Sequence, residues 1–155
     1  MNEHFKPILN FSLQFFYLII LSMVLIGCTT YYIPIESFKQ QFNGIDSTHL
    51  KIVNAIGPIG EKFSYLSNAI DTIYCVDDNN KPFKLLNSPS IEIRFTDNND
   101  DRTIFYFDTV FLQDSLIIGT KSRFIPSFQG IIPIYNVKLI EVQDGKKYFR
   151  YSKDK

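Results

Sequence analysis

Apolar and polar residues alternate along much of the chain after residue 70, and this pattern predicts β-strands. The clearest case covers 91–96, where Ile91, Ile93 and Phe95 alternate with polar residues and so define one dry and one wet face. Over 103–112 apolar residues fall on both faces, which predicts a single, strongly covered strand. Further strands are predicted over 50–56, 70–76, 82–86, 116–118, 123–125, 131–134 and 137–142.

Turn signals and one helical repeat lie between these runs. Ile35, Phe38 and Phe42 repeat at helical spacing and predict a short helix over 35–42 that ends at Asn43-Gly44. Asp144-Gly145 predicts a two-residue hairpin turn, and 61–69 shows no clear pattern. Because proline cannot donate to a β-ladder, 132–138 predicts a strand, a single turn and a new strand, similar to the corner of small Sm-type barrels.

Together these elements predict a mainly β fold, a small antiparallel β-barrel or sandwich with a short N-terminal helix. The composition agrees, since the chain holds 15 Phe and 9 Tyr but no Trp.

The N-terminus carries a different pattern. Lys6 precedes an apolar run over 15–26, and Leu25-Ile26-Gly27-Cys28 closes it. The run is shorter than the roughly 20 residues of a membrane-spanning helix, which favours a cleaved signal peptide over an uncleaved anchor. These residues resemble the lipobox of bacterial lipoproteins.

This resemblance implies cleavage between Gly27 and Cys28, diacylglyceryl attachment to the Cys28 sulfur and anchoring in a membrane by lipid. It divides the protein into a signal peptide (1–27), a lipidated N-terminus and tether (28–34) and a single β-rich domain (35–155). Thr29 stands where an aspartate would signal inner-membrane retention, which favours the outer membrane. No acidic cluster follows the cysteine, which favours the periplasmic face. The late segment 132–142 and the Asn/Ile/Phe/Lys-rich composition also resemble small lipoproteins of Bacteroidota, a likeness that implies no activity.

Charge and cysteine content exclude some functions. The chain has 16 basic and 16 acidic residues, with no basic stripe for nucleic acid. If lipid occupies Cys28, Cys75 has no intramolecular partner, and its apolar surroundings over 70–76 favour a buried inert thiol over a reactive one.

No catalytic, cofactor or metal site is predicted. The acidic loop 97–101 resembles a calcium loop, but Arg102 stands where the sixth-position glycine is required, which favours a solvated hairpin loop. His49 is the only histidine after residue 27, and the sequence has no G-x-S-x-G or H-E-x-x-H pattern.

Four short segments follow the pattern Asp, then Ser or Thr, then an aliphatic residue or Thr. They begin at Asp46, Asp71, Asp108 and Asp114. The pattern resembles the acceptor motif of general O-glycosylation in Bacteroidota, which makes Ser47 and Ser115 the better-exposed candidate sites. The alternative is that Asp-Thr-aliphatic simply suits the start of a strand.

The function expected from the sequence is that of a non-enzymatic, lipid-anchored envelope protein whose β-domain binds a partner protein or supports an assembly. The alternative is a small-molecule or lipid-binding barrel, and a hydrolase comes third.

Overall fold

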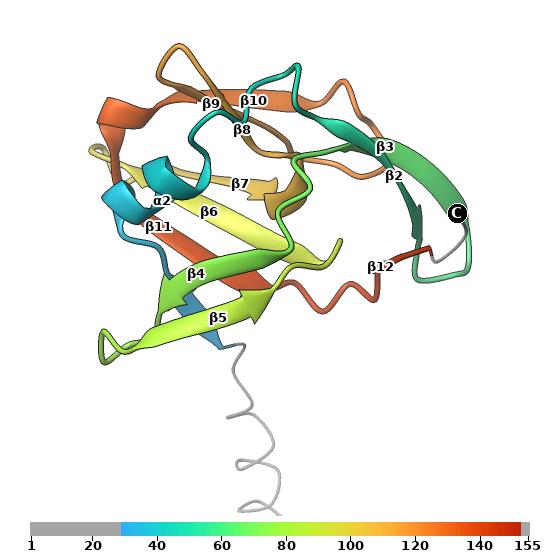
Figure 1. Cartoon of the computed structure of the whole chain (residues 1–155), viewed down its shortest axis with the longest axis horizontal. Coiled ribbons are helices and arrows are strands. Elements are labelled where there is room, and N and C mark those ends of the chain that lie inside the picture. Colours follow the sequence, from blue (N-terminus) through green and yellow to red (C-terminus); the bar gives the residue numbers. More distant parts are fainter. Residues whose placement is uncertain (1–28, 153–155) are drawn as a thin grey trace, which may run out of the picture.

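The computed structural model describes residues 29–152, which form a mainly β domain with antiparallel sheets, consistent with a β-sandwich (Figure 1). Within these residues none of the three sheets closes into a barrel. No helix in this part of the protein has the length and hydropathy needed to cross a membrane. The predicted signal peptide, Gly27 and Cys28 lie outside the described residues.

The largest sheet has six strands in the order β5-β4-β1-β11-β6-β7, and every pairing is antiparallel. Its strands are β1 (Thr30–Tyr32), β4 (Thr72–Val76), β5 (Pro82–Leu86), β6 (Ile91–Asp97), β7 (Arg102–Tyr106) and β11 (Val137–Asp144). The predicted strands over 70–76, 82–86, 91–96 and 137–142 are thereby confirmed. Residues 30–32, expected in the tether, instead belong to the domain, because β1 pairs with both β11 and β4.

Two three-stranded sheets complete the domain. One joins β8 (Phe111–Gln113), β9 (Leu116–Thr120) and β10 (Gln129–Pro133). The other joins β2 (Lys51–Ile56), β3 (Lys62–Ser67) and β12 (Arg150–Tyr151). The strand-turn-strand prediction over 132–138 is confirmed, since a 3-10 turn (Ile134–Asn136) links β10 to β11.

The predicted helix is confirmed as α2 (Ile35–Gln41), which contacts β4 and β11. Its buried Phe38 belongs to a series of rings that fills the core. Neighbouring ring centroids lie 4.4 to 5.9 Å apart along Phe107, Phe42, Phe38, Phe95 and Phe105. The core is therefore packed with aromatic side chains, each of which contributes strongly to stability when buried.

Phe105 also explains how closely β9 and β10 approach the large sheet. Gly119 and Gly130 are paired across these strands, and both face the Phe105 ring. A Cβ added at either glycine would come within 2.7 Å of that ring. Glycine is required here because no side chain fits between strand and ring.

Three sequence predictions are wrong. Residues 103–112 do not form one strand: a 3-10 turn (Phe107–Thr109) separates β7 from β8, so that the backbone passes from one sheet to another. Residues 123–125 lie in a loop, because the Arg123 side chain is buried while Phe124 and Ile125 face outward. Asp144-Gly145 does not open a hairpin, because the segment after it instead buries Phe149 and then pairs β12 with β2.

Candidate functional site

A buried aspartate lies at the break between β7 and β8. Asp108 is in the middle of the Phe107–Thr109 turn and is fully buried. The Asn68 side chain donates hydrogen bonds to the Phe107 and Val110 carbonyls at 2.8 and 2.9 Å, and the Asn68 N–H donates to the Asp108 carbonyl at 2.7 Å. These bonds satisfy backbone groups that the interrupted ladder leaves open, and they fix the position of the Asp108 carboxylate.

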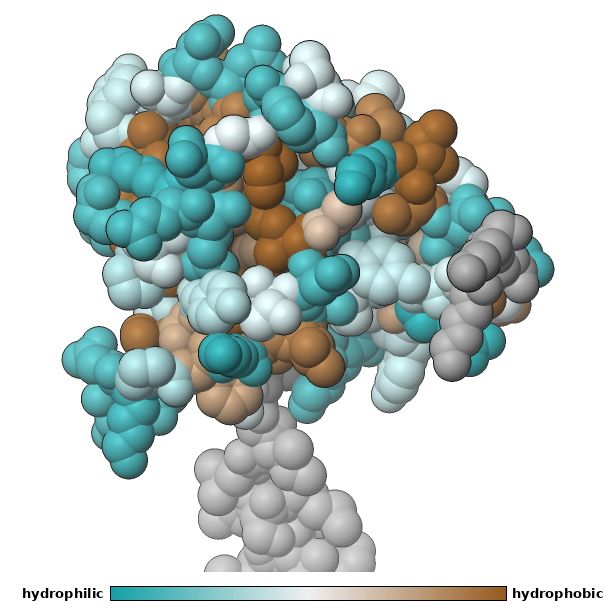
Figure 2. All heavy atoms as spheres, viewed as in Figure 1, coloured by the Kyte–Doolittle hydropathy of each residue, from teal (hydrophilic) through white to brown (hydrophobic). Residues whose placement is uncertain are grey.

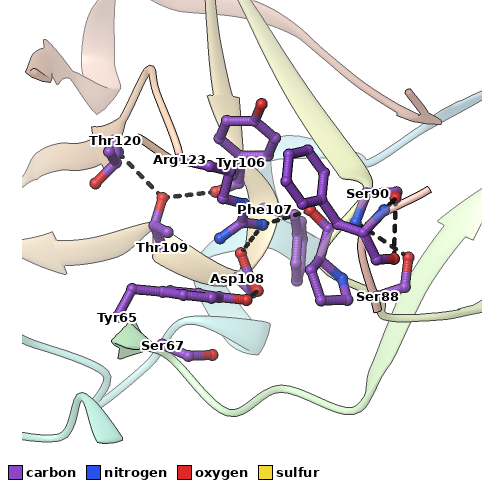
Figure 3. A network of polar contacts seen from close by, with 12 residues as sticks. Tyr65, Ser67, Ser88, Ser90, Tyr106, Phe107, Asp108, Thr109, Thr120 and Arg123 are labelled. Atoms are coloured by element: carbon purple, nitrogen blue, oxygen red, sulfur yellow. Dashed lines mark hydrogen bonds and ion pairs between the residues drawn. The ribbon is translucent and has the colours of Figure 1, made fainter. Parts of the chain in front are cut away.

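The carboxylate is paired with an arginine from the 121–128 loop (Figure 3). Arg123 Nη2 lies 2.6 Å from Asp108 Oδ1, and the two side chains are 1% and 0% exposed. The other carboxylate oxygen, Oδ2, accepts hydrogen bonds from the Tyr65 and Tyr151 hydroxyls at 2.5 and 2.9 Å. The ion pair therefore joins the end of the large sheet to β3 and β12 of a small sheet.

Two tyrosine rings enclose the guanidinium. Its central carbon lies 4.0 Å from the Tyr106 ring centroid and 4.4 Å from that of Tyr65. Arginine stacks well on aromatic faces because its charge is delocalised over a plane. Nη2 also donates to the Pro89 carbonyl at 2.6 Å, whereas Nε and Nη1 are buried without a hydrogen-bond partner among residues 29–152.

Burial keeps the two tyrosine hydroxyls protonated. Loss of solvent, followed by the nearby Asp108 charge, raises the pKa of Tyr65 and of Tyr151 well above that of an exposed tyrosine. Both hydroxyls therefore remain donors to Asp108 at neutral pH, and the carboxylate is fully satisfied. The guanidinium is not, since only one of its three nitrogens is in use.

A cavity of about 230 Å³ lies against this arginine. Its lining mixes the apolar residues Leu50, Leu66, Phe111 and Pro126 with polar ones: Ser64, Tyr65, Thr109, Thr120, Ser122, Arg123 and Gln129. Figure 3 shows the Arg123 guanidinium beside Asp108, between the Tyr65 and Tyr106 side chains. The cavity thus has a mixed lining of apolar and polar residues, whereas the guanidinium itself is buried.

Exposed apolar side chains lie on the cavity wall, at Leu66, and on the 121–128 loop, at Phe124, Ile125 and Phe128. We call Leu66, Phe124, Ile125 and Phe128 the apolar rim; they are 52%, 67%, 56% and 54% exposed. Figure 2 shows apolar residues gathered at the corner where β2 and β3 lie and the 121–128 loop reaches them. The loop has a defined shape, because Ser122 Oγ accepts hydrogen bonds from the Phe124 and Ile125 N–H groups and Phe128 N–H donates to the Ile125 carbonyl.

A larger hollow of about 450 Å³ lies between the end of α2 and the β8–β9 turn. Asp46 and Ser115, from two of the glycosylation segments, line it. The candidate acceptors Ser47 and Ser115 are both exposed, whereas Thr109 of the Asp108 segment is buried. The lining of this hollow includes charged residues, among them Lys39, Asp46 and Asp114.

His49 lies in an exposed turn with Asp46 and Thr48. Its Nδ1 lies 2.9 Å from Asp46 Oδ1 and 3.3 Å from Thr48 Oγ1. A catalytic triad places acid and nucleophile on opposite ring nitrogens, so this exposed cluster is a local turn. Hydrogen bonds from Thr48 and His49 lower the pKa of Asp46 to about 2.

The Cys75 side chain is buried, and burial raises the pKa of its thiol to about 11. In the acidic loop, Asp97 Oδ1 accepts hydrogen bonds from the Asn99 and Asp101 N–H groups, as in a self-contained turn. Among residues 29–152, no three His, Cys, Asp or Glu side chains converge as a metal site would require.

Sequence reasoning misses the residues of the candidate site. The sequence marks Asp108 only as the first residue of a possible glycosylation pattern, and it marks Arg123 only as the first residue of a predicted strand. The available signal is a charged residue within an otherwise apolar segment for Asp108, at 103–112, whereas Arg123 follows Lys121 and Ser122 and gives no such signal. Comparison with protein families, characterised proteins and solved structures finds no match to this protein.

Proposed function

We propose that this chain is a non-enzymatic, lipid-anchored envelope protein whose β-sandwich-like domain binds a partner protein through the apolar rim. The observation that carries the proposal is the exposure of Phe124, Ile125 and Phe128 on one structured loop. Exposed apolar clusters of this kind mark interaction surfaces. Burial of each such side chain in an interface contributes about 1.5–3 kcal/mol.

The anchor is the second part of the proposal. Cys28 would carry the lipid, with Gly27 as the last residue of the signal peptide, and the domain would sit on the outer membrane facing the periplasm. Metabolic labelling with an alkyne fatty acid tests this directly. We expect a labelled protein that lacks residues 1–27, and we expect Cys28→Ala to abolish both label and cleavage. Cleavage without label would contradict the assignment.

The geometry of the titratable groups supports the proposal of a non-enzymatic role. His49 shares a single ring nitrogen with Asp46 and Thr48, and neither His49 nor Thr48 lines the adjacent hollow. Asp108 and Arg123 neutralise each other, and both are buried. This arrangement supports a structural role for these groups.

Site-specific photo-crosslinking in living cells tests the partner. A photoreactive phenylalanine at Ile125 should give one adduct of discrete mass, whereas the same residue at Tyr135, which is 81% exposed on the distant Ile134–Asn136 turn, should give none. Phe124→Ser should reduce the adduct about tenfold or more, because a contribution of 1.5–3 kcal/mol corresponds to that change in affinity. Tyr135→Ser is the matched control. Equal yields at both positions would refute the rim as the binding surface.

The barrel-interior alternative receives no support from the core, which the series of phenylalanine rings fills. A small molecule would then have to use a hollow outside this core, such as the cavity beside Arg123 or the hollow at the end of α2.

A further inference from the structure

The outer edge of β3, which is the edge that does not pair with β2, presents unpaired backbone groups. At the turn between the two strands, Gly57 N–H donates to the Glu61 carbonyl at 2.8 Å, and bonds to one neighbouring strand recur at every second residue. Tyr65 therefore bonds to β2 through its backbone, whereas Ser64 and Leu66 direct their N–H and C=O groups away from β2. Within residues 29–152, these groups of Ser64 and Leu66 make no hydrogen bond.

Two further bonds confirm this alternation. Ser152 N–H donates to the Asn54 carbonyl at 2.8 Å, on the opposite edge of β2 from β3. Asn68 N–H, two residues beyond Leu66, donates to the Asp108 carbonyl at 2.7 Å. The outer edge of β3 thus already makes one backbone bond at Asn68, and the two preceding positions along this edge are open.

The cavity of about 230 Å³ beside Arg123 lies along the open part of this edge. Ser64, Tyr65 and Leu66 are consecutive and all line it, whereas no residue of β2 (Lys51–Ile56) does. Because neighbouring side chains of a strand point to opposite faces, a hollow in contact with all three lies beside the strand and not over one face. At about 30 Å³ for each water-sized unit, the cavity holds roughly seven or eight non-hydrogen atoms, the backbone of about two residues.

The exposed face of the β2–β3 hairpin indicates which side chains an added strand would carry. Leu66 is 52% exposed and pairs across the hairpin with Ile52, which is 76% exposed. Ser64 pairs with Asn54, and their side chains share a hydrogen bond of 2.7 Å. Matching cross-strand neighbours stabilise a sheet, so an added strand fits best with an apolar residue beside Leu66 and a polar residue beside Ser64.

The edge of β5 carries a protection that the open positions of β3 lack. Asn87 N–H donates to the Asp71 carbonyl at 2.9 Å, which places the outward backbone groups of β5 at its even-numbered residues, among them Pro82 and Lys84. Proline has no N–H to offer, and lysine on an edge discourages pairing with another chain. β3 has neither residue type at its two open positions.

We propose that the partner of the apolar rim binds by adding a β-strand to the outer edge of β3. This inference rests on the proposed function, because the rim and this edge share Leu66. The partner contributes an extended segment with an apolar residue beside Leu66 and a polar residue beside Ser64. Its backbone bonds to the N–H and C=O groups of both residues, and the segment occupies the cavity next to them. In this mode of recognition the backbone bonds give affinity and the neighbouring side chains give specificity.

Amide shifts and hydrogen exchange of the purified full-length protein test the pairing with the peptide acetyl-Thr-Val-Thr-Ser-Thr-amide. The Ser64 and Leu66 amides should show saturable shifts at millimolar peptide, and their exchange should slow at least tenfold at saturation. The Tyr65 amide, which already bonds to β2, should change little. Proline in place of the valine and serine of the peptide should remove the protection. Equal protection by the two peptides, or no saturable shift at Ser64 and Leu66, would overturn the proposal.

Leu66→Pro separates backbone pairing from side-chain contact. It removes the outward N–H and leaves the bonds between β3 and β2 in place, which protection of the Tyr65 amide verifies. Leu66→Ala removes the side chain and keeps the N–H, and Lys84→Pro, which removes an outward N–H from the edge of β5, is the matched control. Leu66→Pro should weaken peptide binding at least tenfold more than Leu66→Ala, and Lys84→Pro should leave it unchanged. Equal affinities of Leu66→Pro and Leu66→Ala would overturn backbone pairing, and the exchange experiment on the unaltered protein depends on neither variant.

The cellular crosslink at Ile125 separates this inference from the proposed function. Loss of the adduct in Leu66→Pro, with the adduct retained in Lys84→Pro, supports strand addition. A full adduct in Leu66→Pro would mean that the rim binds its partner without an added strand, which overturns the inference and keeps the proposed function. No adduct in the unaltered protein would refute the rim and with it a strand from the same partner, whereas the peptide titration still decides whether β3 pairs with an added strand.

Discussion

Replacing Arg123 by methionine should destabilise the domain more than any exposed charge substitution. The change keeps a long apolar side chain between the Tyr65 and Tyr106 rings but removes the guanidinium. It leaves the Asp108 carboxylate buried with only the two tyrosine hydroxyls as partners. The Pro89 carbonyl also loses its donor.

The magnitude follows from burial. Breaking a buried ion pair by removing one partner costs about 3–5 kcal/mol, because the remaining charge is not solvated. Stacking of a desolvated arginine on an aromatic ring contributes about 2 kcal/mol, and here two rings lie within 4.4 Å. We therefore expect a loss of at least about 3 kcal/mol, a large share of the roughly 5–15 kcal/mol typical of a domain.

Urea unfolding of the purified protein, followed by tyrosine fluorescence, measures the loss. Lys138→Met is the matched control, because it breaks an ion pair with Asp100 in which the side chains are 38% and 82% exposed. Exposed pairs contribute about 0–1 kcal/mol. The double variant Arg123→Met/Asp108→Asn no longer buries an unpaired carboxylate. Its loss in the free energy of unfolding should therefore be smaller than the sum of the losses of the two single variants. Two results would refute the idea that a buried charge pair links the sheets. One is a loss of under about 1 kcal/mol in the free energy of unfolding for Arg123→Met, and the other is strict additivity of the two single losses in the double variant.

Three further outcomes are expected. Gly119→Ala should lower stability by about 1–3 kcal/mol in urea unfolding, because its Cβ would meet the Phe105 ring at 2.7 Å. Cys75 should react slowly with a thiol reagent at pH 8 in the folded protein and rapidly in urea, because burial raises its pKa to about 11; rapid reaction in the folded state would contradict this. The contribution of Tyr65 to stability should be full below about pH 10 and should fall as the pH rises, by at most about 1.4 kcal/mol per pH unit. The reason is that the folded state keeps the Tyr65 hydroxyl proton at a pH where the unfolded state has released it. Tyr65→Phe should flatten this slope in urea unfolding at pH 9 to 11.

The fold could be predicted where local pattern and burial agree. Strict alternation over β6 and helical spacing over α2 each place one apolar face toward the core, and both elements form as predicted. β1 could not be predicted, since its three residues become a strand only through pairing with β4 and β11, which lie far along the sequence. β3 could not be predicted for the same reason. Residues 61–69 show no clear local pattern, and β3 forms through its pairing with β2.

The candidate site could not be predicted because its residues come from separate segments that local pattern assigns wrongly. That pattern places Asp108 inside a long strand and Arg123 at the start of another. The 3-10 turn that turns Asp108 inward depends on bonds from Asn68, a residue of no sequence motif. Asp108, a charged residue within an apolar run, is the signal that this site leaves in the sequence.

The short distance between the proposed anchor and β1 would orient the domain on the membrane. β1 begins at Thr30, two residues after Cys28. At about 3.3–3.6 Å per extended residue, a lipid on Cys28 would hold β1 within roughly 7 Å of the headgroups. β1 lies inside the six-stranded sheet, so the whole domain would be held. β5, which is separated from β1 by β4, would also lie close to the bilayer, because Phe83 of β5 stacks on Tyr31 of β1.

The apolar rim would then face away from the bilayer, since β2, β3 and the 121–128 loop lie on the opposite side of the domain from the start of β1 (Figure 1). A fluorophore at Lys84, on β5, should be quenched by quenchers attached to lipid headgroups, whereas one at Ile125 should not. A linker of ten Gly/Ser residues inserted before Thr30 should reduce quenching at Lys84, since it adds about 16–19 Å of reach. Equal quenching at the two positions would mean that the rim lies on the lipid, and the proposed protein partner would then have no access to it.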